Sequence, residues 1–352
     1  MLHIFFENQG GISMKTIDLR SDTVTEPTDE MRRAMAEAMV GDDVYDDDIL
    51  TNRLQETAAK MLGKEKALFV PSGTFGNQLC ILSHTRPGNE VIVDDAAHIV
   101  LHEAGASGLI SGVQLRAYDS PGGKTDAEAI RNRIRKDDDI HYPKTALICL
   151  ENARSDGMVI SLDEMKAVRE VSKEFHIPVH IDGARIFNAM EHLSIDAAEL
   201  APLYDSMTFC LSKGLCAPIG SIVAGTEKFI DRAKRFRKIM GGGMRQTGIL
   251  AAAGQIALEI MVKRVGEDHK NAKYLYEKLS GLPKVEMLPM ENVHISMVFF
   301  KYNGNSHKLV ENLAKSGIII NPAEEGLMRF VTHYWITKER IDFVMDEMRK
   351  VL

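Results

Sequence analysis

The sequence predicts an α/β protein, in which a large domain surrounds a mostly parallel seven-stranded sheet and a small α+β domain follows at the C-terminal end. Strand and helix patterns alternate through most of the first 280 residues, which is typical of βαβ units. Several strands are apolar throughout, as expected when helices cover both faces of a sheet. Beyond about residue 281 a shorter run of mixed strands and helices replaces this alternation.

The large domain is assembled from elements that follow one another closely. Its predicted strands are 67–70, 90–93, 113–118, 145–150, 178–181, 205–211 and 221–224. Its predicted helices are 53–62, one from Pro71 to about 85, one through His98 and His102, 161–175, 228–238 and a long one from 247 to about 279. The helix at 161 begins with Ser161 and Glu164 at the spacing of a capping box.

Domain boundaries are expected at two places. Gly281-Leu-Pro283 separates a large domain, 51–280, from a small domain, 281–352, with strands 294–300 and 328–332 and helices 307–316 and from 337. Residues 14–50 form an N-terminal segment, and 1–13 are expected to be an extension, with Met14 a candidate start.

Composition excludes several classes of partner. The chain has 352 residues, 45% of them hydrophobic, and a net charge of −7 that is spread along its length. This gives no reason to expect nucleic acid or an anionic membrane as a partner. The four cysteines lack metal-ligand spacing and are expected to be buried thiols in a reducing cytoplasm. The aspartates at 42–48 match no EF-hand loop, so no metal is predicted.

Two charged residues follow apolar strands and are expected at the same edge of the sheet. Asp182 comes after 178–181, and Lys213 comes after 205–211. Ligands of such sheets bind at the carboxyl ends of the strands. An amine that can form a Schiff base, opposite an acid that can keep a pyridine nitrogen protonated, predicts a pyridoxal phosphate site. The alternatives are a helix cap for Asp182 and a solvated strand-end lysine for Lys213.

A phosphate site is predicted where the second helix begins. In Pro71-Ser72-Gly73-Thr74, backbone N–H groups, a glycine and a hydroxyl meet at the positive end of a helix dipole. The spacing matches neither a Walker loop nor a dinucleotide fingerprint. An ordinary helix cap is the alternative.

Three more residues are candidates for the same pocket. Arg185 lies three residues beyond Asp182 and suits the phenolic oxygen of the cofactor or a substrate carboxylate, although a lone arginine is more often in a surface ion pair. His98 suits ring stacking or proton transfer, with a structural role as the alternative. Arg245 follows a triple glycine and is a candidate phosphate ligand from a second subunit.

Taken jointly, these motifs resemble the L-threonine aldolases of the low-specificity type, which are pyridoxal phosphate enzymes of fold type I, the aspartate aminotransferase fold. The likeness runs from about Ile17 to the C-terminus. It rests on Ile17–Thr25, Gly41–Tyr45, Pro71–Thr74, Ala97-His98, Glu103–Gly105, His180–Arg185, Ser212–Gly214, Gly241–Gln246 and Arg329–His333.

The resemblance implies a role for each matching residue. Lys213 would bind the cofactor covalently, Asp182 would bind the pyridine nitrogen and His98 would stack over the ring. Ser72, Gly73 and Thr74 would hold the phosphate, with Arg245 of a neighbouring subunit. Ser21, Arg185 and Arg329 would hold the substrate carboxylate, and Tyr45 would line the site across a dimer interface. The family is typically a homotetramer built from dimers.

The chain departs from the family pattern at two places. Asp46-Asp47-Asp48 stands where Gly-Asp-Asp is usual, and Ala153-Arg154-Ser155 stands where Thr-His-Asn is usual. The histidine so replaced lies near the substrate β-hydroxyl in relatives, which leaves His98, or a water held by it, as the expected base. Arg154 cannot act as a base, and it would favour a substrate with a second anionic or polar group.

The reaction expected from the resemblance is cleavage of Cα–Cβ in a β-hydroxy-α-amino acid, giving glycine and an aldehyde. A β-eliminating lyase on the same scaffold is the nearest alternative, because the cofactor does not decide which bond breaks. A non-catalytic pyridoxal-binding protein would not need the full set of site residues. A nucleotide-dependent dehydrogenase would need a Gly-x-Gly-x-x-Gly motif, which is missing.

Overall fold

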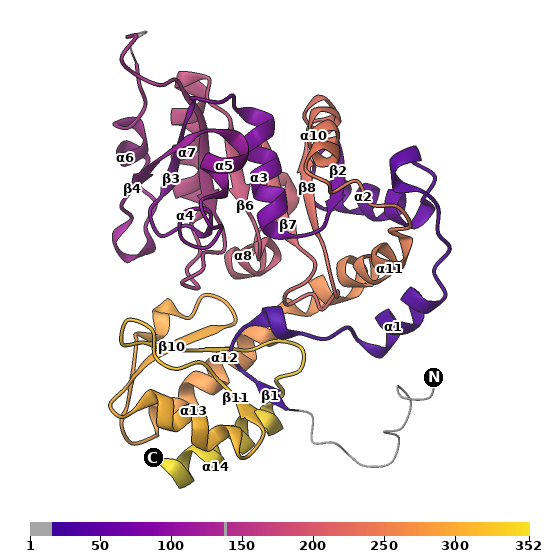
Figure 1. Cartoon of the computed structure of the whole chain (residues 1–352). Helices are drawn as coiled ribbons and strands as arrows, with labels where there is room; N and C mark the ends of the chain where they lie inside the picture. The colour runs from indigo at the N-terminus through magenta and orange to yellow at the C-terminus, as the bar shows by residue number, and fades with distance from the viewer. Residues whose placement is uncertain (1–15, 137–138) are drawn as a thin grey trace.

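The computed structural model describes residues 16–136 and 139–352, so the extension expected at 1–13 lies outside the described residues. Its central feature is a seven-stranded sheet that confirms the predicted fold class (Figure 1). All its strands are parallel except β8, which is antiparallel to both neighbours. In spatial order they are β2 (Lys66–Val70), β8 (Ser221–Gly225), β7 (Ser206–Cys210), β6 (Val179–Asp182), β5 (Thr145–Glu151), β3 (Glu90–Asp94) and β4 (Gln114–Tyr118).

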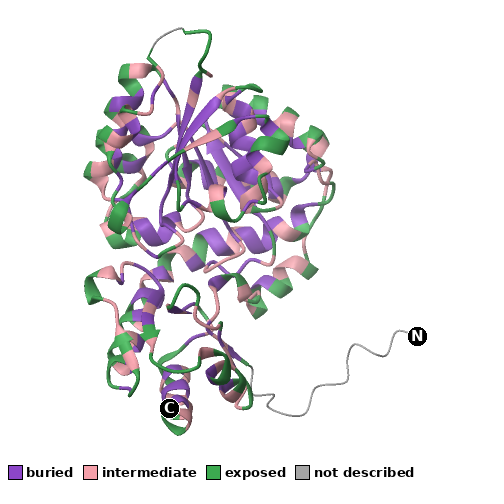
Figure 2. Cartoon of the chain, turned by 60° about the vertical axis from the view of Figure 1, so that its left-hand side comes forward, coloured by how far each residue is buried: buried purple, intermediate pink, exposed green. Residues whose placement is uncertain are grey.

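Helices cover both faces of this sheet, and most of its strands are accordingly buried (Figure 2). One face packs against α2 (Ile49–Met61), α7 (Leu162–Phe175), α8 (Ile186–Leu193) and α11 (Gly248–Ile256). The other packs against α3 (Gly73–His84), α5 (Ala106–Ser111) and α10 (Glu227–Ile239). In β2, Phe69 belongs to the first core and Leu68 and Val70 to the second, as the alternation of side chains along a strand requires.

Helix boundaries follow local capping chemistry. Ser161 and Glu164 form the predicted capping box at the start of α7. The helix expected through His98 and His102 is shorter: α4 (His98–Leu101) is a single turn, and α5 begins after Gly105 at φ +72°. The long helix expected from 247 is interrupted between α11 and α12 (Val265–Ser280) by a π-helical turn at 257–261 and a 3₁₀ turn at 262–264.

The C-terminal part has its own core and sheet. Strands β9 (Val285–Met287), β10 (Met297–Tyr302) and β12 (Met328–Val331) form an antiparallel sheet, packed with α13 (Ser306–Ala314) and α14 (Lys338–Val351). The N-terminal β1 (Ile17–Asp18) pairs in parallel with β11 (Ile318–Ile319). This core also takes in apolar residues of α12, so it begins before the boundary expected near 281.

Within the described part of the chain, no helix combines the length and the apolar composition needed to cross a bilayer.

Candidate active site

The carboxyl ends of β5, β6 and β7 meet the N-terminus of α3 around a cavity of about 300 Å³. Sequence reasoning had predicted seven of its lining residues, which come from four separate regions of the chain: Ser72, Gly73, Thr74, His98, Asp182, Arg185 and Lys213. The predicted acid and amine therefore share one cavity.

The first turn of α3 closes one side of this cavity. Ser72 caps the helix, and its Oγ accepts a hydrogen bond from the Phe75 N–H at 3.2 Å. Gly73 and Gly76 allow the helix to lie directly on β7: a Cβ at Gly73 would be 2.8 Å from Cys210 Sγ, and one at Gly76 would be 2.5 Å from Thr208 Cγ2. The helix dipole and the free N–H groups of this turn make an anion site.

Asp182 ends β6 and is buried. Its Oδ1 accepts the Ala184 N–H at 3.1 Å, and its Oδ2 accepts Asn77 Nδ2 at 2.7 Å. Burial raises the pKa of Asp182, and the positive charge of Lys213 opposes that rise. The bond to Ala184 supports the turn that precedes α8, but the N-cap of α8 is Arg185 and no side chain caps it, so Asp182 is not the helix cap that we considered.

Behind Asp182, a second buried carboxylate organises the neighbouring side chains. Glu103 accepts hydrogen bonds from Asn77 Nδ2 at 2.8 Å, Gln78 Nε2 at 2.6 Å and His98 Nδ1 at 3.0 Å. The bond to Glu103 raises the pKa of His98 and fixes its ring. Ligand atoms of His98, Glu103 and Asp182 lie within 4.8 Å of one another. The Asn77 amide donates to both carboxylates, so the group is a hydrogen-bonded cluster.

Arg185 is held by a residue to which sequence reasoning gave no role. Its Nε and Nη2 donate to the two oxygens of Asp22 at 2.8 and 2.6 Å, in a buried bidentate ion pair. Burial alone would raise the pKa of Asp22, but Arg185 outweighs it and lowers that pKa to about 2. The pair occupies two of the five guanidinium donors and fixes the orientation of the rest. The surface ion pair considered for Arg185 is thus wrong.

Lys213 lies in the loop after β7, and the N-terminal segment holds that loop in place. The Thr25 hydroxyl donates to the Lys213 carbonyl at 2.7 Å, and the Cys216 N–H donates to it at 2.9 Å. Thr23 of the same segment lines the cavity. A segment almost 190 residues away in sequence therefore positions the lysine.

Four predicted site residues do not line the cavity. Ser21 caps the short helix at 22–24 by accepting the Thr23 N–H. Tyr45 is 74% exposed, and the half-exposed Arg245 pairs with Asp42 at 2.8 Å.

Arg329 lies on β12, and its Nη2 donates to the Arg20 carbonyl at 3.2 Å. Burial lowers the pKa of Arg329, and the neighbouring charge of Arg185 adds to this effect. Arg329 thus lies in the field of Arg185, outside the cavity wall.

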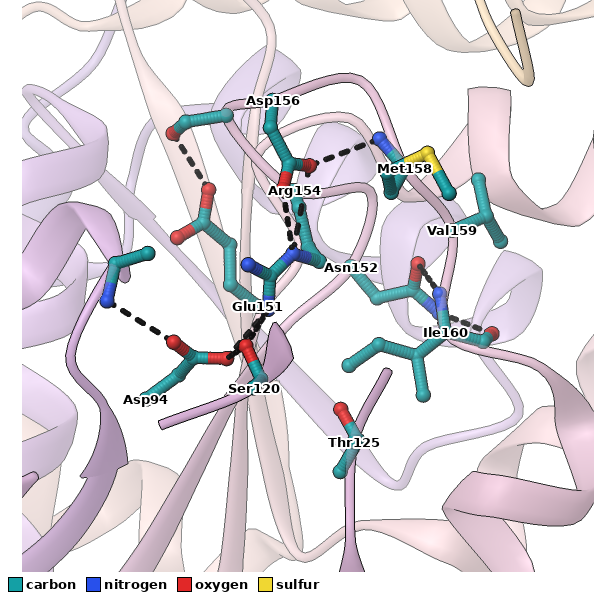
Figure 3. Close-up of polar contacts among 12 residues, drawn as sticks. Asp94, Ser120, Thr125, Glu151, Asn152, Arg154, Asp156, Met158, Val159 and Ile160 are labelled. Carbon is teal, nitrogen blue, oxygen red and sulfur yellow. Dashed lines mark hydrogen bonds and ion pairs between the residues drawn. The ribbon is translucent and has the colours of Figure 1, made fainter. Parts of the chain in front are cut away.

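Arg154, which was expected to favour a substrate with a second anionic or polar group, lies elsewhere in the structure. Its side chain is buried and directed at Asp94, Ser120 and Asp156 (Figure 3). Nη1 contacts Asp94 and donates to Ser120 Oγ at 3.1 Å, while Nε pairs with Asp156 at 3.1 Å. The arginine does not line the cavity, so the idea that it offers a cation to the substrate is not supported.

The arrangement fits pyridoxal phosphate. An anion site at a helix N-terminus, a buried carboxylate and a lysine amine surround one cavity, and glycine replaces side chains where α3 must lie close to β7. The carboxylate has neutral hydrogen-bond partners and no ion-paired cation among the described residues, which suits it to a protonated ring nitrogen. Fold and site together define a pyridoxal phosphate-dependent enzyme.

Comparison with known proteins agrees with this class. The model of the beta-eliminating lyase family matches residues 18–302. A low-specificity L-threonine aldolase of Arabidopsis thaliana is 42% identical over 95% of both chains, and one of Escherichia coli K12 is 41% identical over 96% of this chain and 99% of its own. The solved threonine aldolase of Leishmania major has the same fold, with a TM-score of 0.81 at 17% identity over 95% of this chain and 99% of its own. The chain belongs to the beta-eliminating lyase family, and within it to the low-specificity L-threonine aldolases.

Proposed function

We propose that this lyase cleaves the Cα–Cβ bond of L-threonine, L-allo-threonine or a related β-hydroxy-α-amino acid to glycine and an aldehyde. One observation carries the proposal: Asp182 and Lys213 line one cavity at the ends of neighbouring strands, beside the anion site of α3. Lys213 would hold pyridoxal phosphate covalently, Asp182 its ring nitrogen and Ser72, Gly73 and Thr74 its phosphate. When bound, the cofactor withdraws the electron pair that bond cleavage leaves at Cα.

Orientation of the substrate falls to the arginines. Arg185, fixed by Asp22, presents its remaining donors where a carboxylate can be gripped. Arg329 and Ser21 are proposed to complete the carboxylate site. Holding the carboxylate would fix rotation about the Cα–N bond of the substrate and so the direction of its Cα–Cβ bond, and orientation of this kind can lower a barrier by several kcal/mol. His98, held through Nδ1 by Glu103, is proposed to stack on the ring.

We further propose a homotetramer built from dimers. Tyr45 and Arg245 do not line the cavity of their own chain, and this supports roles in a neighbouring subunit. Exposed apolar side chains around Tyr45, namely Met39, Val40 and Ile49, suit a covered surface. A cytoplasmic location is supported by the four cysteines, which are free and buried.

A product assay tests the reaction. The holoenzyme is given L-threonine, L-allo-threonine and L-serine separately, and acetaldehyde, glycine and pyruvate are measured. Glycine with acetaldehyde in equal amounts is expected from the first two. The match to the beta-eliminating lyase model favours β-elimination as the rival, and pyruvate from L-serine without glycine would establish it instead.

A further inference from the structure

The β-hydroxyl proton needs an acceptor, and Arg154 is not available for this role. Its guanidinium is neutralised by Asp94 and Asp156, does not line the cavity and cannot be deprotonated at ordinary pH. The loop after β5 instead directs the next residue, Ser155, into the cavity.

Ser155 is hydrogen-bonded to a carboxylate that the reaction scheme above leaves unused. Glu151 is the last residue of β5, and it pairs in register with Asp182 on β6, so both side chains project from the same face of the sheet edge. The Ser155 hydroxyl donates to Glu151 Oε1 at 2.6 Å, and the His98 backbone N–H donates to Oε2 at 2.7 Å. Glu151 and Ser155 both line the cavity.

The surroundings of Glu151 suit a proton acceptor. Its hydrogen-bond partners are neutral, and no cation among the described residues is ion-paired with it. The charged groups that it faces are Asp182 on β6, the His98 ring on α4 and Arg185 before α8. Burial and the negative charge of Asp182 raise the pKa of Glu151, which brings it closer to the pH at which a general base is effective.

The other two acids near the cavity, Asp182 and Glu103, have different roles. Asp182 is bound by Asn77 and Ala184 and faces the proposed ring nitrogen, while Glu103 lies behind His98 and does not line the cavity. His98 is held at Nδ1 by Glu103, which suits a stacking role.

We infer that Glu151, acting through the Ser155 hydroxyl, accepts the β-hydroxyl proton of the substrate; this inference rests on the proposed Cα–Cβ cleavage. The substrate O–H bond breaks, its proton passes to Ser155 Oγ, and the Ser155 proton passes to Glu151 Oε1. The O–H electron pair becomes the second bond of the aldehyde carbonyl while Cα–Cβ breaks, and the electron pair of that bond stays at Cα, where the cofactor, when bound, would withdraw it. After the aldehyde leaves, Cα of glycine takes a proton from water, and the hydroxide that remains takes the proton of Glu151, so water is restored and no further reactant is needed.

The decisive variant is Glu151→Gln in the holoenzyme. An amide keeps both hydrogen bonds, because its oxygen can accept the His98 N–H and its NH₂ can donate to Ser155, but it cannot take up a proton. We expect kcat for threonine cleavage to fall about a hundredfold or more, with KM nearly unchanged and the acid limb of the pH profile lost. Glu90→Gln is the matched control, since Glu90 is a buried glutamate at the amino end of β3, away from the cavity. This control variant should keep the wild-type pH profile.

Ser155→Ala tests the relay separately. In the wild type, the hydrogen bond from the Ser155 hydroxyl lowers the pKa of Glu151. Removing the hydroxyl should therefore raise the pKa of Glu151 and move the acid limb of the pH profile to higher pH. We expect about a tenfold loss of kcat, because water replaces the hydroxyl imperfectly. If Glu151→Gln does not fold, the direction of this shift decides: an unmoved acid limb overturns the inference.

A measurement independent of turnover is infrared difference spectroscopy of the holoenzyme. A carboxylic acid C=O band that titrates in the wild type and is missing in Glu151→Gln identifies Glu151 as the proton-binding group. Binding of L-2-aminobutyrate, which lacks the β-hydroxyl, should be equal in both proteins. Wild-type kcat and an unchanged acid limb in Glu151→Gln would overturn the assignment while leaving the aldolase reaction intact. A wild-type enzyme that makes no glycine and aldehyde would overturn both.

Discussion

Two buried carboxylates, one lining the cavity and one paired with the arginine that lines it, have pKa values shifted in opposite directions. Asp182, on the sheet side, has its pKa raised, whereas Asp22, on the side of the N-terminal segment, has a pKa of about 2. Both are almost inaccessible to solvent. They differ in their partners, which are an amide and a backbone N–H for Asp182 but a bidentate guanidinium for Asp22.

Burial raises the pKa of both acids, and the difference shows that the partner decides whether that rise remains or is reversed. On the sheet side, Asp182 and Glu151 have no ion-paired cation among the described residues, so they are available to a cofactor nitrogen or a substrate proton. In the N-terminal segment, the Asp22 carboxylate accepts both of its hydrogen bonds from Arg185 and fixes that side chain. The carboxylates at the sheet edge are thus suited to proton and cofactor chemistry, whereas Asp22 serves to orient Arg185.

Lys213 is the charge shared by both sides, because it acts on the pKa of Asp22 and of Asp182. Lys213→Ala should have the largest effect: turnover and the lysine-linked absorbance of the holoenzyme should both be abolished. Absorbance spectra and a glycine assay check this. Normal activity in this variant would refute the cofactor assignment.

Asp182→Asn changes only the sheet side. The amide keeps the size of the side chain but cannot carry the negative charge that holds the ring nitrogen protonated. We expect the cofactor to remain bound and kcat to fall about a hundredfold or more. Equilibrium dialysis of the cofactor and steady-state kinetics separate the two effects, and a rate close to that of the wild type would show that Asp182 only supports the turn before α8.

Asp22→Asn changes the ion pair with Arg185 and should reduce the free energy of unfolding more than it lowers kcat. The folded pKa of Asp22, about 2 against an ordinary 3.8, corresponds to about 2 kcal/mol of stability above pH 4 that is lost as the pH falls towards 2. Denaturant unfolding should show the variant destabilised by about 2–4 kcal/mol at pH 7. On acidification, the free energy of unfolding of the variant should fall less than that of the wild type.

The control for this prediction is Glu259→Gln, which removes an exposed ion pair with Arg53. Such a pair contributes up to about 1 kcal/mol. Equal destabilisation in the two variants would contradict a special role for the buried Asp22–Arg185 pair.

The smallest expected effect concerns His98, which lines the cavity. The hydrogen bond to the Glu103 carboxylate, with the charge of Glu103 as a smaller contribution, raises the pKa of His98. Glu103→Gln replaces that acceptor by a neutral amide, so the pKa of His98 should fall towards the ordinary value. NMR titration of the ring checks it, with His192, which lies elsewhere and has its pKa lowered by burial, as the internal reference. An unchanged His98 titration would mean that Glu103 does not control the ring.

Local chemistry explains why much of the site was predictable. Apolar strands ending in Asp182 and before Lys213, and a capping serine ahead of Gly73, are signals within a few residues of each other. Helix interruptions were less visible, because the π turn between α11 and α12 occurs in a run of ordinary helix-forming residues. The identity of the partner of Arg185 carried no local signal at all, since Asp22 lies 163 residues away.

The sequence alone determined the sheet, the helices that cover it and the lysine, aspartate and glycine-rich turn at its edge, because periodicity and capping act over short distances. Only the tertiary structure decided that Arg154 turns away to Asp94, that Asp22 fixes Arg185 and that Glu151 meets Ser155 inside the cavity. Those pairings depend on which buried charges come within hydrogen-bonding distance, and that is settled only when distant segments pack together.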